Sequence, residues 1–561
     1  MSDTPPDRLS VDPSSPYHDA EALQRGVGVR FKGEEKTNVE EYCVSEGWVR
    51  LALGNRVDRK GKALTVKLQG TGRGFPSGAA PMPLRLLTAS ALALGLVAFA
   101  PLASAQDAAT VERAIAIRDA ALRSNIALDY VAQLTTRFGA RPAGSKAEQD
   151  AAAWAADYLR AHGFQNVRIE EFPLVGWERG ESSAAIVGDH AQALVAAALG
   201  HSPATPAGGV EAEIVRFASM EDLQAAPDAA VRGKIVYVDL GQMHPMQDGS
   251  GYGPQTRVRG AGPGVAAAKG AAAFVMRSVG SDEDRMPHTG TTRYVDGKPT
   301  IPAFALSAPD ADQVSRLVAL GEPVRMRLTS TAHTYETHSQ NVIGDLPGAS
   351  RPDEIIVLGS HMDSWDLGTG AIDDGAGGAI TVAAAKAIAD SGRRPARTLR
   401  VIFYGSEEVA QPTPRTGNGG GVYARNQGAA LDKHIIAGES DFGADRVYAL
   451  RLPAGAQGSD FQKAATRVLY PIGVLASDRV ETEGGVDVGP MGPLGVPFFG
   501  LAQDGTRYFD LHHTANDTLD KIDPAQLSQN VAAWAGLLWL IADSDVDFRA
   551  MRPAAPATPA R

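Results

Sequence analysis

Apolar and polar positions alternate in blocks along the C-terminal part of the chain. Short apolar runs between turn residues are typical of buried strands, and apolar residues at every third or fourth position are typical of helices. This pattern predicts strands at residues 354–358, 399–404, 434–437 and 496–501. Helices are expected at residues 377–389 and after Asp523-Pro524, which would cap a final amphipathic helix. Such alternation indicates an α/β domain with a mixed, mostly parallel central sheet flanked by helices.

Residues 107–163 are Ala-rich and helical in pattern. Ser145 and Glu148 have the spacing of a capping box, which predicts that a helix begins there. Gly163 is placed to end that helix as the first residue beyond its C-terminus. A strand is expected next, at residues 167–172.

The pattern changes at residues 176–335, where short β-type runs alternate with Gly- and Pro-rich turns. Strands are expected at residues 212–217, 234–238 and 271–276, with one helical run at residues 264–269. The segment resembles an inserted, β-rich protease-associated domain. It carries no catalytic motif of its own.

Residues 82–105 have the three parts of a secretory signal peptide. Arg85 supplies the positive start, residues 86–100 are apolar, and Ala103-Ser104-Ala105 forms a small-residue cleavage site. The apolar run is short for a membrane anchor. We therefore predict a periplasmic or secreted protein that begins at Gln106 and keeps no stable membrane span.

Residues 1–81 precede this signal and resemble a short bacterial family of unknown function. Signal peptides act at N-termini, so either translation starts at Met82 or two genes are fused; the first explanation is favoured. At the other end, the Pro- and Ala-rich residues 546–561 are expected to be disordered.

The net charge and the cysteine content exclude some kinds of partner and some kinds of metal site. The formal net charge of −11 argues against a nucleic-acid partner, which needs a basic surface. The single cysteine, Cys43, rules out both an internal disulfide and a Cys-rich zinc site. Any metal must therefore be held by His, Asp and Glu.

Five segments carry such side chains, most of them directly after a predicted strand. They are residues 359–366 (GSHMDSWD), 373–375 (DDG), 405–408 (GSEE), 439–441 (ESD) and 512–518 (HHTANDT). Each segment alone is a weak signal. Together they indicate convergence at one sheet edge, where clustered carboxylates need a cation to neutralise them.

These segments resemble the dizinc exopeptidase family of bacterial aminopeptidases and glutamate carboxypeptidases, and within it the carboxypeptidase Q branch. The resemblance implies two Zn²⁺ ions per chain and a peptide substrate. His361, Asp373 and Asp441 would hold one ion; Asp373, Glu408 and His513 would hold the other, with Asp373 bridging.

The resemblance also assigns the remaining roles. Glu407 would be the general base, and Asp363 would orient His361. The peptide bond between Asp373 and Asp374 is often cis in this family. Many relatives have Tyr where this chain has His512, so His512 would help to hold the oxyanion or bind substrate; by register, His512 itself could instead be the ligand.

The exopeptidase domain would comprise residues 106–175 and 336–545, interrupted by the insertion. Aminopeptidase and carboxypeptidase or dipeptidase activity share this metal chemistry, and the sequence leaves the choice open. A non-catalytic binding protein on the same scaffold, or a dizinc hydrolase of another amide, are the alternatives. The carboxypeptidase Q branch also implies a homodimer.

Overall fold

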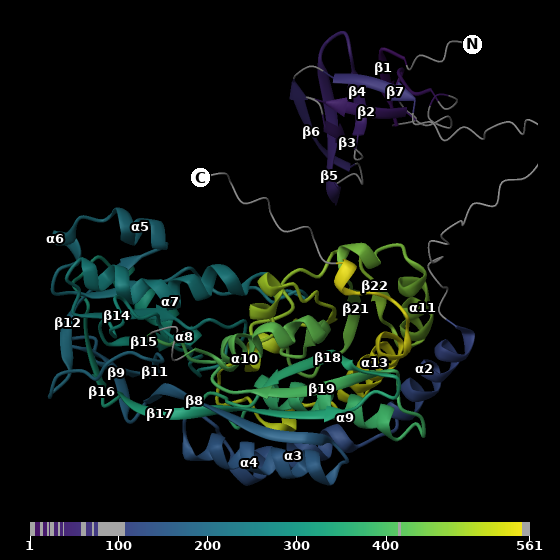
Figure 1. The fold of residues 1–561 in the computed structure, drawn as a ribbon. Coiled ribbons are helices and arrows are strands. Elements are labelled where there is room, and N and C mark those ends of the chain that lie inside the picture. Colours follow the sequence, from purple (N-terminus) through teal and green to yellow (C-terminus); the bar gives the residue numbers. More distant parts are fainter. Residues whose placement is uncertain are drawn as a thin grey trace, which may run out of the picture. The chain divides into compact units, whose positions relative to one another are not determined.

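The computed structural model describes residues 107–412 and 417–551, together with parts of residues 6–76. The chain divides into two compact units, Met1–Phe99 and Ala100–Arg561 (Figure 1). The predicted signal peptide at residues 82–105 lies outside the described residues. No helix among the described residues has both the length and the apolar character that crossing a membrane requires.

The N-terminal unit is built from short antiparallel strands. They are β1 (Arg8–Ser10), β2 (Val27–Phe31), β3 (Glu34–Lys36), β4 (Val39–Cys43), β5 (Trp48–Val57), β6 (Ala63–Gln69) and β7 (Gly72–Pro76). They form two sheets in the orders β1-β4-β5-β6 and β3-β2-β7. Leu9, Tyr42, Val49 and Leu51 contribute to a small core of their own.

The second unit is organised around a five-stranded sheet of order β20-β18-β19-β17-β8. Its strands are β8 (Gln165–Glu178), β17 (His333–Leu346), β18 (Arg351–His361), β19 (Arg397–Tyr404) and β20 (His434–Glu439). β18 is parallel to both β19 and β20, whereas β17 is antiparallel to β19 and β8. The sheet is mixed, and its parallel strands are those that precede the predicted metal ligands.

Two layers of helices and loops cover this sheet because its strands are apolar on both faces. Ile356 and Leu358 share a core with α9 (Ala376–Ala389) and α13 (Pro524–Asp543), while Ile355 and Val357 pack with α10 (Gly419–Gln427) on the other face. This alternation is the period of two expected for a strand. The helices of the first core also include α2 (Ala108–Ala121), α3 (Ile126–Phe138) and α4 (Lys146–Ala161).

The helix signals in residues 145–163 are confirmed, with one difference. The Ser145 hydroxyl accepts the Glu148 N–H at 3.2 Å, and Gly163 follows the helix with φ of +87°. Glu148 does not complete the capping box. Its buried carboxylate instead accepts the Gly144 N–H at 2.6 Å and the Ser339 hydroxyl at 2.5 Å, because α4 lies against β17.

The inserted segment contains an eight-stranded sheet of order β10-β9-β16-β12-β13-β14-β15-β11. Its strands are β9 (Ser182–Val187), β10 (Gln192–Leu194), β11 (Ala196–Ala198), β12 (Val210–Phe217), β13 (Ile235–Val238), β14 (Ala273–Arg277), β15 (Ala303–Leu306) and β16 (Arg325–Ser330). Four helices accompany it: α5 (Met220–Ala225), α6 (Asp228–Val231), α7 (Tyr252–Ala268) and α8 (Ala308–Ala319).

The long strands β8 and β17 run from the five-stranded sheet to the insertion as one antiparallel pair (Figure 1). The predicted boundaries of the insertion, residues 176 and 335, face each other in this pair, with Gly176 opposite Tyr335. The predicted helical run at residues 264–269 is wrong in extent. Helix α7 begins at Tyr252, ends at Ala268 and contains Pro263.

The strand predicted at residues 496–501 is only partly correct. Phe498 makes an isolated parallel bridge to Ala437, but the strand itself, β23 (Gly500–Gln503), belongs to a separate sheet. That sheet pairs β23 with β21 (Val447–Arg451), and β21 with β22 (Leu475–Ala476). Helices α11 (Asp460–Leu469) and α12 (Tyr508–Leu511) complete this region.

Two predictions about the C-terminal end are corrected. Helix α13 is buried on nearly all sides, with Trp534 and Trp539 fully buried, so it is a core helix and not an amphipathic one. Residues 546–551, predicted to be disordered, have definite contacts. Phe548 is fully buried against Phe461, and the Arg549 guanidinium donates to the carbonyl of His434 at 2.7 Å.

Candidate metal centre

The ends of three parallel strands bring the first candidate ligands together. Strand β18 ends at His361, β19 is followed by Glu407 and Glu408, and β20 ends just before Asp441. Because parallel strands end at the same edge of a sheet, their following residues meet there. His361 Nε2 lies 3.5 Å from Asp441 Oδ1.

Asp373 lies at the middle of the group. Its Oδ1 lies 3.2 Å from His361 Nε2, and its Oδ2 lies 3.2 Å from His513 Nε2. The Asp373–Asp374 peptide bond is cis, as the resemblance implied. Asp373 therefore faces both predicted ion positions, which is the arrangement that a bridging carboxylate needs.

Glu408 and His513 form the other half of the cluster. His513 Nε2 lies 2.9 Å from Glu408 Oε2, and its Nδ1 donates to the Thr289 carbonyl at 3.1 Å. His512 Nε2 is 3.5 Å from Asp373 Oδ2, and its ring stacks on that of His513 at 3.5 Å. His513 contacts both acidic partners and its second nitrogen is fixed, so the geometry favours His513 as the ligand.

Two positions at the cluster have unusual backbone geometry. Among the described non-glycine residues, five have positive φ, and they include Ser406 (+60°) and His513 (+63°). Left-handed conformations are uncommon for side chains of this kind and concentrate at functional sites. At Ser406 the turn directs the chain from β19 into Glu407 and Glu408.

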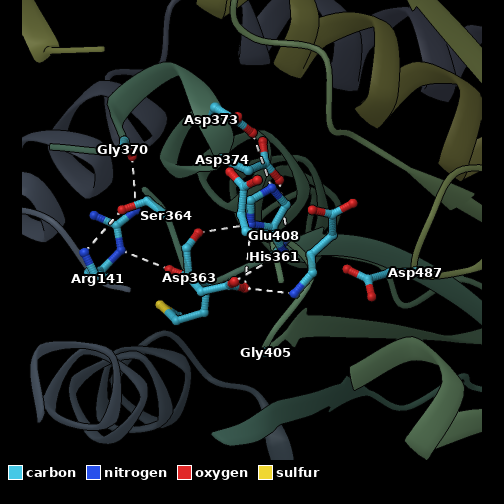
Figure 2. Close-up of polar contacts among 12 residues, drawn as sticks. Arg141, His361, Asp363, Ser364, Gly370, Asp373, Asp374, Gly405, Glu408 and Asp487 are labelled. Carbon is cyan, nitrogen blue, oxygen red and sulfur yellow. Dashed lines mark hydrogen bonds and ion pairs between the residues drawn. The ribbon is translucent and has the colours of Figure 1, made fainter. Parts of the chain in front are cut away.

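Asp363 contacts His361 through its backbone carbonyl and the Glu407–Glu408 turn through its carboxylate. The His361 Nδ1–H donates to the backbone carbonyl of Asp363 at 2.8 Å, while the Asp363 carboxylate lies 3.7 Å from that nitrogen. The carboxylate accepts the N–H groups of Glu407 at 3.0 Å and Glu408 at 3.2 Å (Figure 2). Asp363 thus holds the Glu407–Glu408 turn as well as the imidazole.

The electrostatics of the cluster suit a cation. Burial lowers the pKa of His361, but the nearby carboxylates of Asp363, Asp373 and Asp441 outweigh it and place this pKa well above that of a free histidine. Burial keeps the imidazoles of His512 and His513 neutral by lowering their pKa, to about 4 for His513. The acidic groups around His361 thus stabilise positive charge at its ring, while His512 and His513 offer neutral ring nitrogens, which zinc accepts as ligands.

Two buried oxygen atoms support the same interpretation. Glu408 Oε1 and Asp373 Oδ2 are shielded from water and accept no hydrogen bond. Buried carboxylate oxygens without a partner are costly. Three groups in the cluster have donor atoms within 4.8 Å of one another: Asp373-His512-His513, His361-Asp373-Glu408 and His361-Asp374-Asp441. The donor set therefore fits a metal centre.

Glu407, the predicted general base, has a raised pKa. Burial raises the pKa of Glu407 well above that of a free glutamate, and the neighbouring acidic groups Asp441, Asp363 and Asp373 add to the effect. A carboxyl group with a raised pKa can exchange protons near neutral pH. A cation beside it would oppose this shift.

The structure adds residues that sequence reasoning missed. Arg141 is fully buried and donates to the carbonyls of Gly139, Met362, Thr369 and Gly370 at 2.7–2.9 Å. It thereby holds the loop that carries Asp363 (Figure 2). A single arginine in a Gly- and Pro-containing turn gives no sequence signal for this role.

Asp374 and Trp365 were also missed, although both lie within the five acidic and histidine-bearing segments. Asp374 is fully buried and accepts the His361 N–H at 3.1 Å and the Gly377 N–H at 3.0 Å. Trp365 donates from Nε1 to Glu408 Oε2 at 2.6 Å. Asp487 is fully buried beside the cluster (Figure 2).

A cleft of about 420 Å³ opens beside Asp441 and Phe442. Its walls include Tyr448, Arg451 and Glu481. The cluster is therefore accessible from the side of Asp441, which is one of its least buried side chains at 18% exposure.

Comparison with known proteins finds a family match for each of the two units of the chain. Residues 6–75 match a family model described as a protein of unknown function, DUF3297, which confirms the resemblance predicted for residues 1–81. Residues 341–538 match the model of peptidase family M28. All five candidate metal ligands lie within the second match.

Curated relatives cover more of the chain. Mouse carboxypeptidase Q is 32% identical over 423 residues, which are 75% of this chain and 86% of the relative. Human carboxypeptidase Q is 31% identical over the same length, with the same coverage.

Solved structures agree with these relatives. A peptidase M28 precursor from Shewanella amazonensis SB2B is 42% identical and has a TM-score of 0.75, covering 80% of this chain and 99% of that structure. A zinc aminopeptidase from Bacillus subtilis has a TM-score of 0.53 at 17% identity, covering 76% of this chain and 97% of that structure, and so shares the fold. The resemblance drawn from the sequence is confirmed: this chain belongs to peptidase family M28.

Proposed function

We propose that this chain is a zinc-dependent exopeptidase that hydrolyses dipeptides or terminal peptide bonds. The main support for this proposal is that five side chains converge on one buried cluster: His361, Asp373, Glu408, Asp441 and His513. Membership of peptidase family M28 gives the reaction class, and the carboxypeptidase Q and zinc aminopeptidase relatives support zinc and an exopeptidase.

His361, Asp373 and Asp441 would hold one Zn²⁺, and Asp373, Glu408 and His513 would hold the other. Asp373 would bridge them, because each of its oxygens faces a different histidine. When bound, two zinc ions act as Lewis acids, which lowers the pKa of a bound water molecule and polarises the scissile carbonyl.

Glu407 would take the proton from that water and pass it to the leaving amine. Its backbone N–H is held by Asp363, and its neighbour Glu408 would be held by zinc, so its carboxylate can stay free. His512, stacked on His513 and 3.5 Å from Asp373, would donate a hydrogen bond to the carbonyl oxygen as negative charge develops there.

The inserted segment would be a protease-associated-like domain, and residues 82–105 would direct the protein to the periplasm or the medium. N-terminal sequencing of exported protein should give Gln106. A start at Met1 or Ser2 would contradict this assignment.

The decisive experiment combines metal analysis with product analysis. Purified full-length protein should contain two zinc ions per chain and hydrolyse dipeptides. A chelator should abolish hydrolysis, and zinc should restore it. Peptides blocked at the N- or C-terminus would then show which end is recognised. Zinc bound without hydrolysis of any peptide or amide would indicate a binding protein, and activity only on other amides would indicate a different hydrolase.

A further inference from the structure

Trp365 connects two candidate ligands of the same proposed zinc ion. It lies in the loop after β18 and is 6% exposed. Its Nε1–H donates to Glu408 Oε2 at 2.6 Å, and its ring centroid lies 5.6 Å from that of His513, with the rings inclined at 57°. No other described tryptophan donates to a residue of the cluster.

The hydrogen bond decides which oxygen of Glu408 is free. Oε2 accepts from the indole and lies 2.9 Å from His513 Nε2, whereas Oε1 is buried and has no hydrogen-bond partner. A donor to one oxygen of a ligand carboxylate fixes its rotamer and leaves the other oxygen for the metal. The indole N–H thus orients Glu408.

The insertion holds the indole in place. A Cβ at Gly200 would lie 2.3 Å from Trp365 Cη2, so the ring rests directly on the glycine backbone. The Gly200 backbone is itself fixed, since its N–H donates to the Gly290 carbonyl and its carbonyl accepts the Thr292 N–H, both at 2.9 Å.

The same stretch of the insertion reaches His513. The Thr289 carbonyl accepts the His513 Nδ1–H at 3.1 Å, and the His513 carbonyl in turn accepts the Thr289 N–H at 3.0 Å. Residues far apart in the sequence therefore fix both ligands from one side. Within the described residues, the carboxylate of Asp441, in the other ligand group, pairs with His361 and not with the insertion.

We propose that Trp365 is a positioning residue for the Glu408–His513 zinc site, and that this site depends on the insertion through Gly200 and Thr289. The inference rests on the proposed dizinc function. On this view the insertion sets the affinity of one of the two ions and leaves the other unaffected.

The test compares Trp365→Phe with Trp177→Phe in the full-length chain. Trp177 is a matched control, because its indole is also buried, lies 6.2 Å from that of Trp365 and donates to a backbone carbonyl, that of Ser202. Zinc titration of the metal-free proteins would give the stoichiometry and the two dissociation constants. Circular dichroism would establish that each variant is folded.

We expect Trp365→Phe to weaken binding of one zinc ion roughly 10–100-fold and to leave the other unchanged, while Trp177→Phe binds both as the wild type does. Gly200→Ala should reproduce the selective loss by displacing the ring, and it decides the matter if Trp365→Phe does not fold. Two unchanged affinities in the folded variants would overturn the proposal, as would equal weakening of both ions. A wild-type protein that binds no zinc would instead overturn the proposed function.

Discussion

Asp517 accepts the backbone N–H of Ile372 at 2.6 Å and that of Asp373 at 3.4 Å, one with each carboxylate oxygen. The acidic residue of the HHTANDT motif therefore holds the turn that carries the bridging candidate, Asp373, although the two lie 144 residues apart. Burial raises the pKa of Asp517 to about 7, and the charge of Asp373 adds to the effect.

Asp517→Asn should weaken zinc binding roughly 10–100-fold, because the amide NH₂ would face a backbone N–H and the turn would lose one of its two acceptors. Zinc titration checks this. Asp520→Asn, in an exposed position three residues along, should bind zinc as the wild type does. Equal affinities in both variants would show that the turn does not need this carboxylate.

Glu407→Gln should keep two zinc ions and lose activity. The amide cannot accept the proton, and a general base contributes roughly 10²–10⁴-fold, so kcat should fall by at least about 100-fold, or ~3 kcal/mol. Zinc content and dipeptide hydrolysis, measured on the same preparation, check this. Normal turnover with full zinc would remove Glu407 from its proposed role.

Asp373→Ala and Asp441→Ala should differ in zinc stoichiometry. Asp373 faces both His361 and His513, whereas Asp441 contacts His361 but, of the described histidines, not His513. The first change should therefore remove both ions, and the second only one. Elemental analysis after dialysis at a fixed free-zinc concentration would decide, and a single retained ion in Asp373→Ala would argue against a bridging carboxylate.

Arg141→Lys should destabilise the fold strongly although it conserves charge. Lysine has three donors on one nitrogen and cannot reach the four carbonyls that Arg141 satisfies. Each buried carbonyl left unpaired costs about 1–3 kcal/mol, so a loss of at least ~3 kcal/mol in the free energy of unfolding is expected. Arg137→Lys, at an exposed position four residues earlier, should change this value by less than about 0.5 kcal/mol in urea denaturation.

His434 should make stability depend on pH. Burial, with the charge of Arg400, lowers the pKa of this residue to about 4, and its neutral ring accepts from the Tyr423 hydroxyl at 2.7 Å and donates to the Ala430 carbonyl at 3.1 Å. Between about pH 6.5 and pH 4 the unfolded chain binds a proton that the folded chain does not. The contribution of His434 is therefore complete above about pH 6.5 and is lost as the pH falls toward about 4.

The measurement is the difference in urea-derived stability between wild type and His434→Gln at about pH 7.5 and about pH 5. The wild type should lose about 2 kcal/mol more than the variant over this interval. His190→Gln, at a side chain that is 45% exposed, serves as the control and should follow the wild type. A pH dependence that His434→Gln leaves unchanged would contradict the assignment.

Local signals in the sequence were sufficient where a short stretch determines its own structure. The apolar runs before His361 and Glu407 predicted β18 and β19, and the Ser145 cap and Gly163 predicted both ends of α4. These local signals failed where a contact with a residue distant in the sequence determines the structure. Glu148 turns away from its capping box toward Ser339, and Phe498 bridges to Ala437 while the next residues join another sheet.

The sequence by itself limited the donor types, because one cysteine and five His/Asp/Glu segments leave only nitrogen and oxygen ligands. It also predicted the strands that precede His361, Glu408 and Asp441. Only the tertiary structure shows that His513 contacts both Asp373 and Glu408, which favours it over His512 as a candidate ligand. Only the tertiary structure shows that Arg141 and Trp365 support the candidate ligands and that Gly200 and Thr289 lie beside them. The physical reason is that such roles depend on hydrogen-bond angles and contact distances between residues that lie 43 to 224 positions apart, and neither composition nor periodicity records them.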